Sequence, residues 1–83
     1  KPTFGSLGLA RKLQMLDSTQ GGVKRIKFVG VVTNMCVISN AVIAKAACPE
    51  AEIVIVEDLV ASFDEQLHKE AINVMKYMQM TIE

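Results

Sequence analysis

The feature that most constrains this chain is a short strand-like run that passes at once into an alanine-rich helix. Residues 26–29, Ile-Lys-Phe-Val, form a short run rich in the β-branched and aromatic residues typical of a buried strand. Gly30 ends this run, and the apolar stretch from Ile38 to Ala47 is long enough for three helical turns. Thr33 and Asn34 are both good N-cap residues, so the helix is predicted to begin at one of them. The chain therefore turns sharply from a strand into a helix.

Cys36 falls in the first turn of this predicted helix. Backbone N–H groups without helical partners and the positive end of the helix dipole meet there. This environment favours the thiolate, which is the form of cysteine that attacks a carbonyl carbon. A lone cysteine in an apolar helix is also commonly a small buried hydrophobic residue. We interpret Cys36 as a candidate nucleophile and Cys48, which lacks such a position, as a core residue.

The residues that follow complete a strand–helix–strand unit. Pro49 ends the helix, and the continuous apolar run Ile53–Val56 suits a parallel strand that is covered on both faces. Residues 57–61 are predicted to form the loop at the carboxyl end of this strand. Ser62 and Glu65 match a capping box, with serine at the N-cap and glutamate at N3, so a third helix is predicted to begin there.

Helical spacing of leucines predicts a first helix over Leu7–Leu16, and Thr81–Ile82 could begin a further edge strand. The order helix, strand, helix, strand, helix predicts an α/β fold built on part of a doubly wound parallel sheet. In such sheets ligands bind beyond the carboxyl ends of the strands, which is where Cys36 lies. His68 could serve as a base for a cysteine, but we interpret it as a surface histidine on the polar side of the third helix.

The composition favours a chain that needs a partner to cover apolar surface. Its 83 residues are 51% hydrophobic and 22% charged, a high apolar share for a body with a modest core. We therefore expect either a piece of a larger domain or assembly with copies of itself.

Nine cations balance nine anions without a basic stripe, which argues against a nucleic-acid partner. No apolar run reaches the ~18 residues of a membrane span, so we expect no membrane partner. Two cysteines do not make a disulfide framework, which favours a reducing, cytoplasmic location.

The stretch Gly30–Val37, Gly-Val-Val-Thr-Asn-Met-Cys-Val, resembles the signature of the isochorismatase-like cysteine hydrolases, the superfamily that includes the nicotinamidases. The likeness extends to residues 1–6, where these enzymes carry a catalytic lysine followed by an aromatic residue. It also covers residues 39–41 and residues 56–62. The resemblance implies a three-layer α/β/α doubly wound parallel sheet, of which residues 1–83 would be the C-terminal part of a single domain.

The resemblance also implies an Asp-Lys-Cys triad. Carried over, Cys36 is the nucleophile and Lys1 is the lysine, whereas the aspartate lies upstream of the residues present here. The family further implies a cis peptide between Val31 and Val32 and an oxyanion hole formed by the backbone N–H groups of Val32 and Cys36. Phe4 is expected to line the substrate pocket.

The implied reaction is hydrolysis of a small amide through a cysteine thioester, with nicotinamide as the first candidate substrate. Alternatives within the superfamily are hydrolysis of a carbamoyl compound or of the enol ether of isochorismate. An alternative of another class is a non-catalytic oligomerisation or binding fragment. The sequence shows no spacing of His, Cys, Asp and Glu that matches a metal site, so we expect no cofactor here. The resemblance implies that nicotinamidases bind a divalent metal, such as zinc, through residues upstream. Expected partners are the amide substrate, the remainder of the same domain and further copies of the chain.

Overall fold

A computed structural model describes residues 4–19 and 21–83 of the chain. Its elements, in chain order, are α1 (Leu7–Thr19), β1 (Arg25–Val31), a π-helical turn (Thr33–Val37), α2 (Ile38–Ala47), β2 (Glu52–Ala61), α3 (Glu65–Tyr77) and β3 (Thr81–Ile82). The three strands form one parallel sheet in the order β1-β2-β3. This arrangement confirms the predicted α/β fold.

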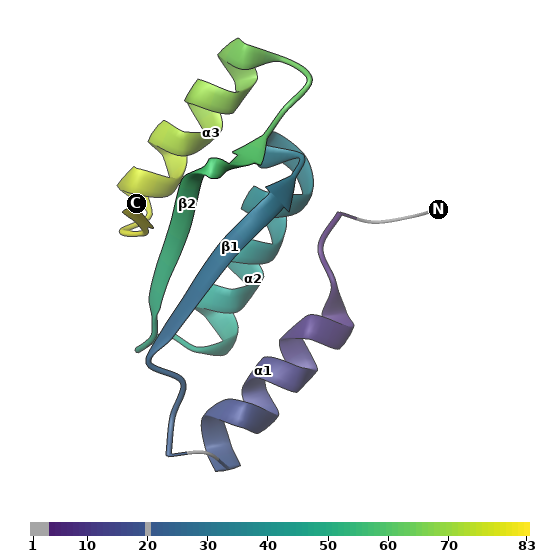
Figure 1. Cartoon of the computed structure of the whole chain (residues 1–83). Helices are drawn as coiled ribbons and strands as arrows, with labels where there is room; N and C mark the ends of the chain where they lie inside the picture. Colours follow the sequence, from purple (N-terminus) through teal and green to yellow (C-terminus); the bar gives the residue numbers. More distant parts are fainter. Residues whose placement is uncertain (1–3, 20) are drawn as a thin grey trace.

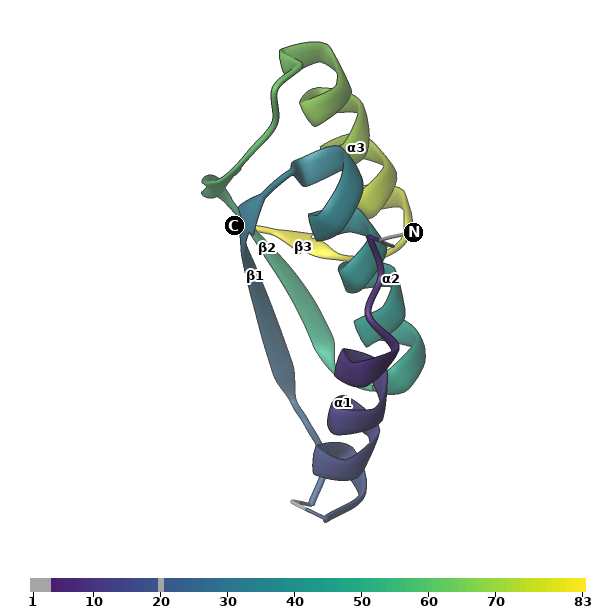
Figure 2. The ribbon, with the colours of Figure 1, turned by 90° about the vertical axis from the view of Figure 1, so that its right-hand side faces the viewer.

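All three helices lie on one face of the sheet, as the two perpendicular views show (Figures 1 and 2). The second helical layer of the expected three-layer fold is not found among the described residues. Ile53 and Ile55 of β2 belong to the core on the helical side and are 1% and 0% exposed. Ala41 and Ala44 of α2 are fully buried in the same core. Small side chains on α2 therefore let this helix pack closely on the strands that it connects.

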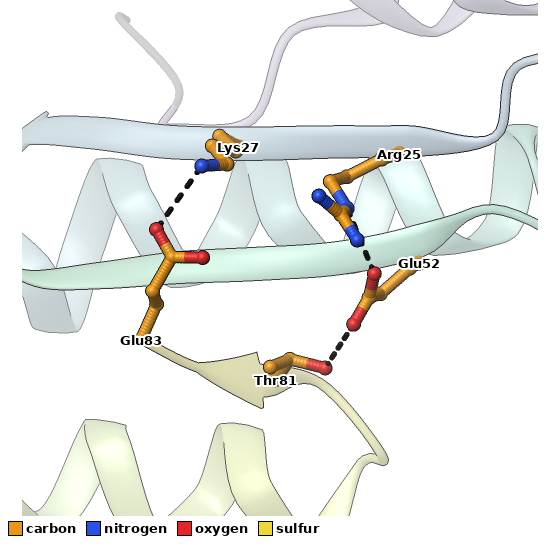
Figure 3. A network of polar contacts seen from close by, with 5 residues as sticks. All are labelled: Arg25, Lys27, Glu52, Thr81 and Glu83. Atoms are coloured by element: carbon orange, nitrogen blue, oxygen red, sulfur yellow. Dashed lines mark hydrogen bonds and ion pairs between the residues drawn. The ribbon is translucent and has the colours of Figure 1, made fainter.

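A network of polar side chains joins the three strands (Figure 3). Arg25 Nε on β1 lies 2.9 Å from Glu52 Oε1 on β2, and Lys27 Nζ lies 3.1 Å from Glu83 Oε1, just after β3. The Thr81 hydroxyl donates to Glu52 Oε2 at 2.9 Å. The hydrogen bond from Thr81 and then that from Arg25 lower the pKa of Glu52. Because these ion pairs are about half exposed, they contribute little to stability. Arg25 and Glu52 are also partners in the register of β1 and β2.

The second strand continues beyond the end that the sequence predicts at Val56. Phe28 of β1 pairs with Ile55 of β2, but the next described pair joins Gly30 to Val60. Several residues of β2 therefore bulge out opposite a single residue of β1, after which the pairing resumes. Gly30 has a φ of 123°, a conformation that residues with a side chain rarely adopt. The predicted loop over residues 57–61 is thus wrong in part, because Val60 and Ala61 pair with β1 again after the bulge.

The cap of α3 differs from the predicted capping box. Asp64 is the N-cap, and its side chain accepts a hydrogen bond from the Leu67 N–H at 3.0 Å. Ser62 lies before the helix, where its hydroxyl accepts from the Asp64 N–H at 3.2 Å and contacts Asn34. The prediction of Ser62 at the N-cap is wrong because aspartate caps equally well and the serine serves another contact.

Two predicted elements near the ends of the chain are found. The first helix begins at Leu7 and continues to Thr19, three residues beyond its predicted end. The hydroxyls of Ser18 and Thr19 both donate to the Met15 carbonyl in this last turn. Thr81–Ile82 forms β3, which pairs in parallel with β2. Within residues 4–19 and 21–83 no helix is both long and apolar enough to cross a bilayer.

Candidate active site

Cys36 lies in the π-helical turn Thr33–Val37. This turn joins the tip of β1 to the start of α2 (Figure 1). The Val32 carbonyl accepts from the N–H groups of Met35 at 3.1 Å and Val37 at 3.0 Å. The second of these bonds closes the wide turn that defines a π-helix, a feature frequent at functional sites. The Cys36 side chain is half-buried, and the peptide between Val31 and Val32 is cis.

Two side chains of this turn bind other parts of the chain. Thr33 is fully buried, and its hydroxyl lies 2.8 Å from Nδ1 of His68 on α3. Asn34 Oδ1 accepts a hydrogen bond from the Ser62 hydroxyl in the segment between β2 and α3. The prediction that Thr33 or Asn34 caps the helix is therefore wrong. Val32 is the N-cap of the π-helical turn, and its apolar side chain has no acceptor for a cap hydrogen bond. The side chains of Thr33 and Asn34 serve tertiary contacts instead.

His68 is not the surface residue that the sequence predicts. It is half-buried and bound to Thr33, although its neighbours along the chain are exposed. The sequence holds a signal for this placement. Ala71, Ile72 and Met75 are buried and follow His68 at spacings of three, four and seven, so His68 extends the apolar stripe of α3. This stripe faces the core and the turn that carries Cys36.

Asn40 connects residues 4–6 to the turn that carries Cys36. Its Nδ2 donates to the Cys36 carbonyl at 2.8 Å and to the Phe4 carbonyl at 2.9 Å. Its Oδ1 accepts from the Ser6 N–H at 3.0 Å. The sequence predicts no role for Asn40, although the spacing of four residues places it on the same helical face as Cys36. Lys1, the other expected catalytic residue, lies outside the described residues.

A pocket of about 240 Å³ borders the Cys36 side chain and is called the Cys36 pocket below. A smaller pocket of about 90 Å³ is lined by Val31, Val32, Ala61, Ser62 and Phe63. Phe4, expected in the substrate pocket, contributes its carbonyl to Asn40, whereas its side chain is 54% exposed and lines neither pocket. The Cys36 pocket is lined by Leu9, Phe28, Val29, Val31, Cys36, Val37 and Asn40.

Cys48 has the opposite environment to Cys36. It is 0% exposed, and its thiol donates to the Leu13 carbonyl at 3.6 Å. Burial, and to a smaller extent the Asp17 carboxylate, raise the pKa of the Cys48 thiol. Such a thiol is a poor nucleophile, so Cys48 is the core residue that the sequence predicts. Both cysteines are free thiols.

The described residues do not offer a metal site. Among residues 4–19 and 21–83 there is no group of three or more His, Cys, Asp and Glu side chains that could hold an ion. The described residues therefore do not fit such an ion, whose ligands the resemblance places upstream. No step proposed below passes through a metal.

We predict that His68→Ala lowers the free energy of unfolding by about 1–3 kcal/mol, because the buried Thr33 hydroxyl loses this partner. Denaturant unfolding of the whole protein measures this loss. Thr33→Val combined with His68→Ala removes both polar partners and should recover part of it. Equal losses in His68→Ala and in the double variant would show that the hydrogen bond does not stabilise the turn.

The comparisons with known proteins agree on one family. The family model for the isochorismatase domain matches residues 11–83 of the chain. No curated protein matches the sequence. Among solved structures, an isochorismatase-like hydrolase from Alkaliphilus metalliredigens superposes with a TM-score of 0.70 at 25% identity, covering 86% of this chain.

Two further structures share the fold at lower identity. A nicotinamidase from Bacillus subtilis gives a TM-score of 0.76 at 24% identity over 99% of this chain. The protein PnC1 from L. infantum, solved in complex with nicotinate, gives 0.78 at 22% identity over 98%. The chain spans 37% of the Alkaliphilus hydrolase, 44% of the Bacillus nicotinamidase and 41% of PnC1. It therefore corresponds to less than half the length of each of these three proteins.

Proposed function

The chain belongs to the isochorismatase family, and from this premise we propose that it carries the nucleophile of an enzyme that hydrolyses a small amide. Cys36 is the proposed nucleophile. The observation that carries the proposal is the place of its thiol, half-buried in the turn after β1 and beside an apolar pocket. Parallel α/β sheets bind their ligands beyond the carboxyl ends of the strands, which is where this turn lies. Cys48, buried in the core, offers no comparable position.

In the proposed reaction the thiolate of Cys36 attacks the carbonyl carbon of the amide, and a carbon–sulfur bond forms. The upstream aspartate takes the thiol proton, and the charged ammonium of Lys1 stabilises the thiolate. The backbone N–H groups of Val32 and Cys36 hold the negative oxygen of the tetrahedral intermediate. The carbon–nitrogen bond then breaks as the aspartate returns the proton to the departing ammonia. Water hydrolyses the thioester, which releases the carboxylic acid and restores the thiol.

The Cys36 pocket supports a small substrate with an apolar ring. Its volume of about 240 Å³ is below the roughly 300–1,000 Å³ typical of sites for drug-sized ligands. The residues Phe28, Val29 and Val31 line it, and Asn40 is the one lining residue with a side-chain amide. A heteroaromatic carboxamide matches this combination, and the fold shared with nicotinamidases makes nicotinamide the first substrate to test.

We predict that iodoacetamide modifies Cys36 at least about 10-fold faster than Cys48 and inactivates the whole protein in step with that modification. The reason is that Cys36 borders a pocket, whereas burial protects Cys48 and raises the pKa of its thiol. Mass spectrometry of digested samples gives the modification of each cysteine, and release of ammonia from nicotinamide gives the activity.

The matched control is the Cys48→Ala variant, which should be alkylated and inactivated with the rate of the unchanged protein. Protection of Cys36 by nicotinate, the reaction product, would support the amide assignment. Full alkylation of Cys36 with undiminished ammonia release would exclude this residue as the nucleophile.

A further inference from the structure

We propose that His68 is a positioning residue, which fixes the start of the π-helical turn Thr33–Val37 through the buried hydroxyl of Thr33. This turn is called the Cys36 turn below. The inference rests on the proposed function, in which the backbone N–H of Val32 is one of the two donors that hold the negative oxygen. His68 sets where this donor lies and takes no part in the reaction itself.

The bond between Thr33 and His68 joins residues that are 35 positions apart in the chain. Oγ1 of Thr33 lies 2.8 Å from Nδ1 of His68. Thr33 is 0% exposed, and within residues 4–19 and 21–83 this is the one hydrogen bond that the structure gives its hydroxyl. A buried hydroxyl that loses its partner is costly, so the bond ties Thr33 to α3.

The two ends of the Cys36 turn are held by different side chains. At its start, Thr33 directly follows Val32 and is bound by His68. Near its end, the Cys36 carbonyl accepts a hydrogen bond from Asn40 at 2.8 Å. Loss of the His68 bond therefore releases the part of the turn next to Val32, while the Asn40 bond still holds Cys36.

A second tertiary contact limits how far the Cys36 turn can move. Asn34 Oδ1 accepts a hydrogen bond from the Ser62 hydroxyl, and this bond does not involve His68. The Val32 carbonyl also still accepts from the N–H groups within the turn. We therefore expect the turn to shift at its start, and not to unfold, when the His68 bond is lost.

His68 acts on the reaction only through Thr33. It is not among the residues that line the Cys36 pocket. It borders a separate pocket of about 330 Å³, whose other lining residues are Val60, Ala61, Ser62 and Glu65. A general base must lie within hydrogen-bond reach of the proton that it takes, and His68 makes no hydrogen bond to Cys36 among the residues that the structure describes.

Turnover and alkylation of Cys36 should respond differently to loss of this bond. Amide hydrolysis puts negative charge on an oxygen that the Val32 N–H must reach, and a misplacement of about 1 Å can cost about 100-fold in rate. Iodoacetamide is attacked at its CH₂ carbon and loses iodide, so no negative oxygen forms. A misplaced Val32 N–H therefore slows hydrolysis and leaves alkylation unchanged.

The test uses matched substitutions in the whole protein. His68→Leu and His68→Asn have side chains of nearly the same shape, but only asparagine carries polar atoms on Cγ, where histidine carries Nδ1. Thr33→Val removes the hydroxyl and keeps the branched shape. A double variant combines Thr33→Val with His68→Leu. Asn73→Leu, a polar-to-apolar change at an exposed position of α3, is the control.

Three quantities are measured for every variant: kcat and KM for nicotinamide, the rate of Cys36 alkylation, and thermal unfolding. The last identifies the variants that fold. We expect Thr33→Val to fold even where His68→Leu does not, because it leaves no buried hydroxyl and the half-buried His68 can bind water instead.

We expect His68→Leu and Thr33→Val each to lower kcat by about 10- to 100-fold, with less than about a threefold change in KM or in the alkylation rate. His68→Asn should recover most of the lost kcat. The double variant should be no slower than the slower single variant, because both changes remove the same bond. Asn73→Leu should behave as the unchanged protein.

Three results would overturn the proposal. An unchanged kcat in Thr33→Val would show that the bond positions no donor. Parallel losses of kcat and of the alkylation rate would show that the bond acts on the thiol instead. A His68→Asn variant as slow as His68→Leu would show that the hydrogen bond is not what His68 contributes.

Failure of the proposed function would look different. An unchanged protein that releases no ammonia from nicotinamide would overturn the substrate assignment, whatever the variants do. The positioning is then decided by amide hydrogen exchange of Met35 and Val37, whose N–H groups bond the Val32 carbonyl. Faster exchange in Thr33→Val would support the positioning role, and an unchanged rate would contradict it.

Discussion

Cys36→Ala is expected to lower the turnover of the whole protein by at least about 10⁴-fold while leaving its fold intact. Without a nucleophile no thioester forms, and the proposed oxyanion donors and the pocket would by themselves give only weak catalysis. The side chain is half-buried in a turn held by other contacts, so the free energy of unfolding should change by only about 1 kcal/mol. Ammonia release from nicotinamide and denaturant unfolding measure the two quantities on the same sample.

Cys48→Ala is the matched control, because it truncates the same side chain in the core. It should retain turnover yet lose more stability than Cys36→Ala, since Cys48 is 0% exposed and its removal leaves a cavity. Comparing Cys36→Ala with Cys48→Ala therefore separates an effect on turnover from an effect on the free energy of unfolding. Normal amidase activity in Cys36→Ala would refute covalent catalysis through this residue.

The strand–helix–strand unit around Cys36 could be predicted because each of its parts has a local signal. Gly30 ends β1, alanines fill α2 and the run Ile53–Val56 forms the buried part of β2. These signals depend on residues close in the chain, and they place Cys36 in the turn that the structure has. The family match over residues 11–83 agrees with the motif around this cysteine.

The contacts that hold the turn could not be predicted in the same way, because they join residues far apart in the chain. Thr33 and Asn34 are residue types that often cap helices. Here the Thr33 side chain binds His68 of α3, and the Asn34 side chain binds Ser62, which precedes α3. The spacing of His68 from the buried residues of α3 could have predicted that His68 faces the core. For Asn40 the helical face was predictable, whereas its bond to Phe4 depends on how the N-terminal segment folds back. Thr33 and Asn34 have a local preference for N-cap positions, but contacts formed in the folded chain determine what their side chains bind.

The second large effect is expected for Lys1→Met, which should cut turnover by about 100-fold or more and shift the alkylation profile of Cys36 upward. The physical reason is electrostatic. An ammonium ~4 Å from a thiolate, at an effective dielectric of ~20, contributes ~4 kcal/mol of attraction before desolvation costs. Even a third of this attraction corresponds to a shift of about one pH unit. Methionine keeps the length and the apolar stem of the side chain and removes the charge, so the change isolates this attraction.

The measurement is the rate of iodoacetamide modification of Cys36 across the pH range, read by mass spectrometry in the whole protein. Salt screens exposed charges more than buried ones. If the Lys1 ammonium and the Cys36 thiolate are exposed to solvent, raised salt should shift the alkylation profile of the unchanged protein toward that of Lys1→Met. Lys12→Met, which removes an exposed lysine from α1, is the matched control and should leave the profile unchanged. If Lys1→Met and Lys12→Met give the same alkylation profile, Lys1 does not stabilise the thiolate, and the cation that does so must come from another part of the protein.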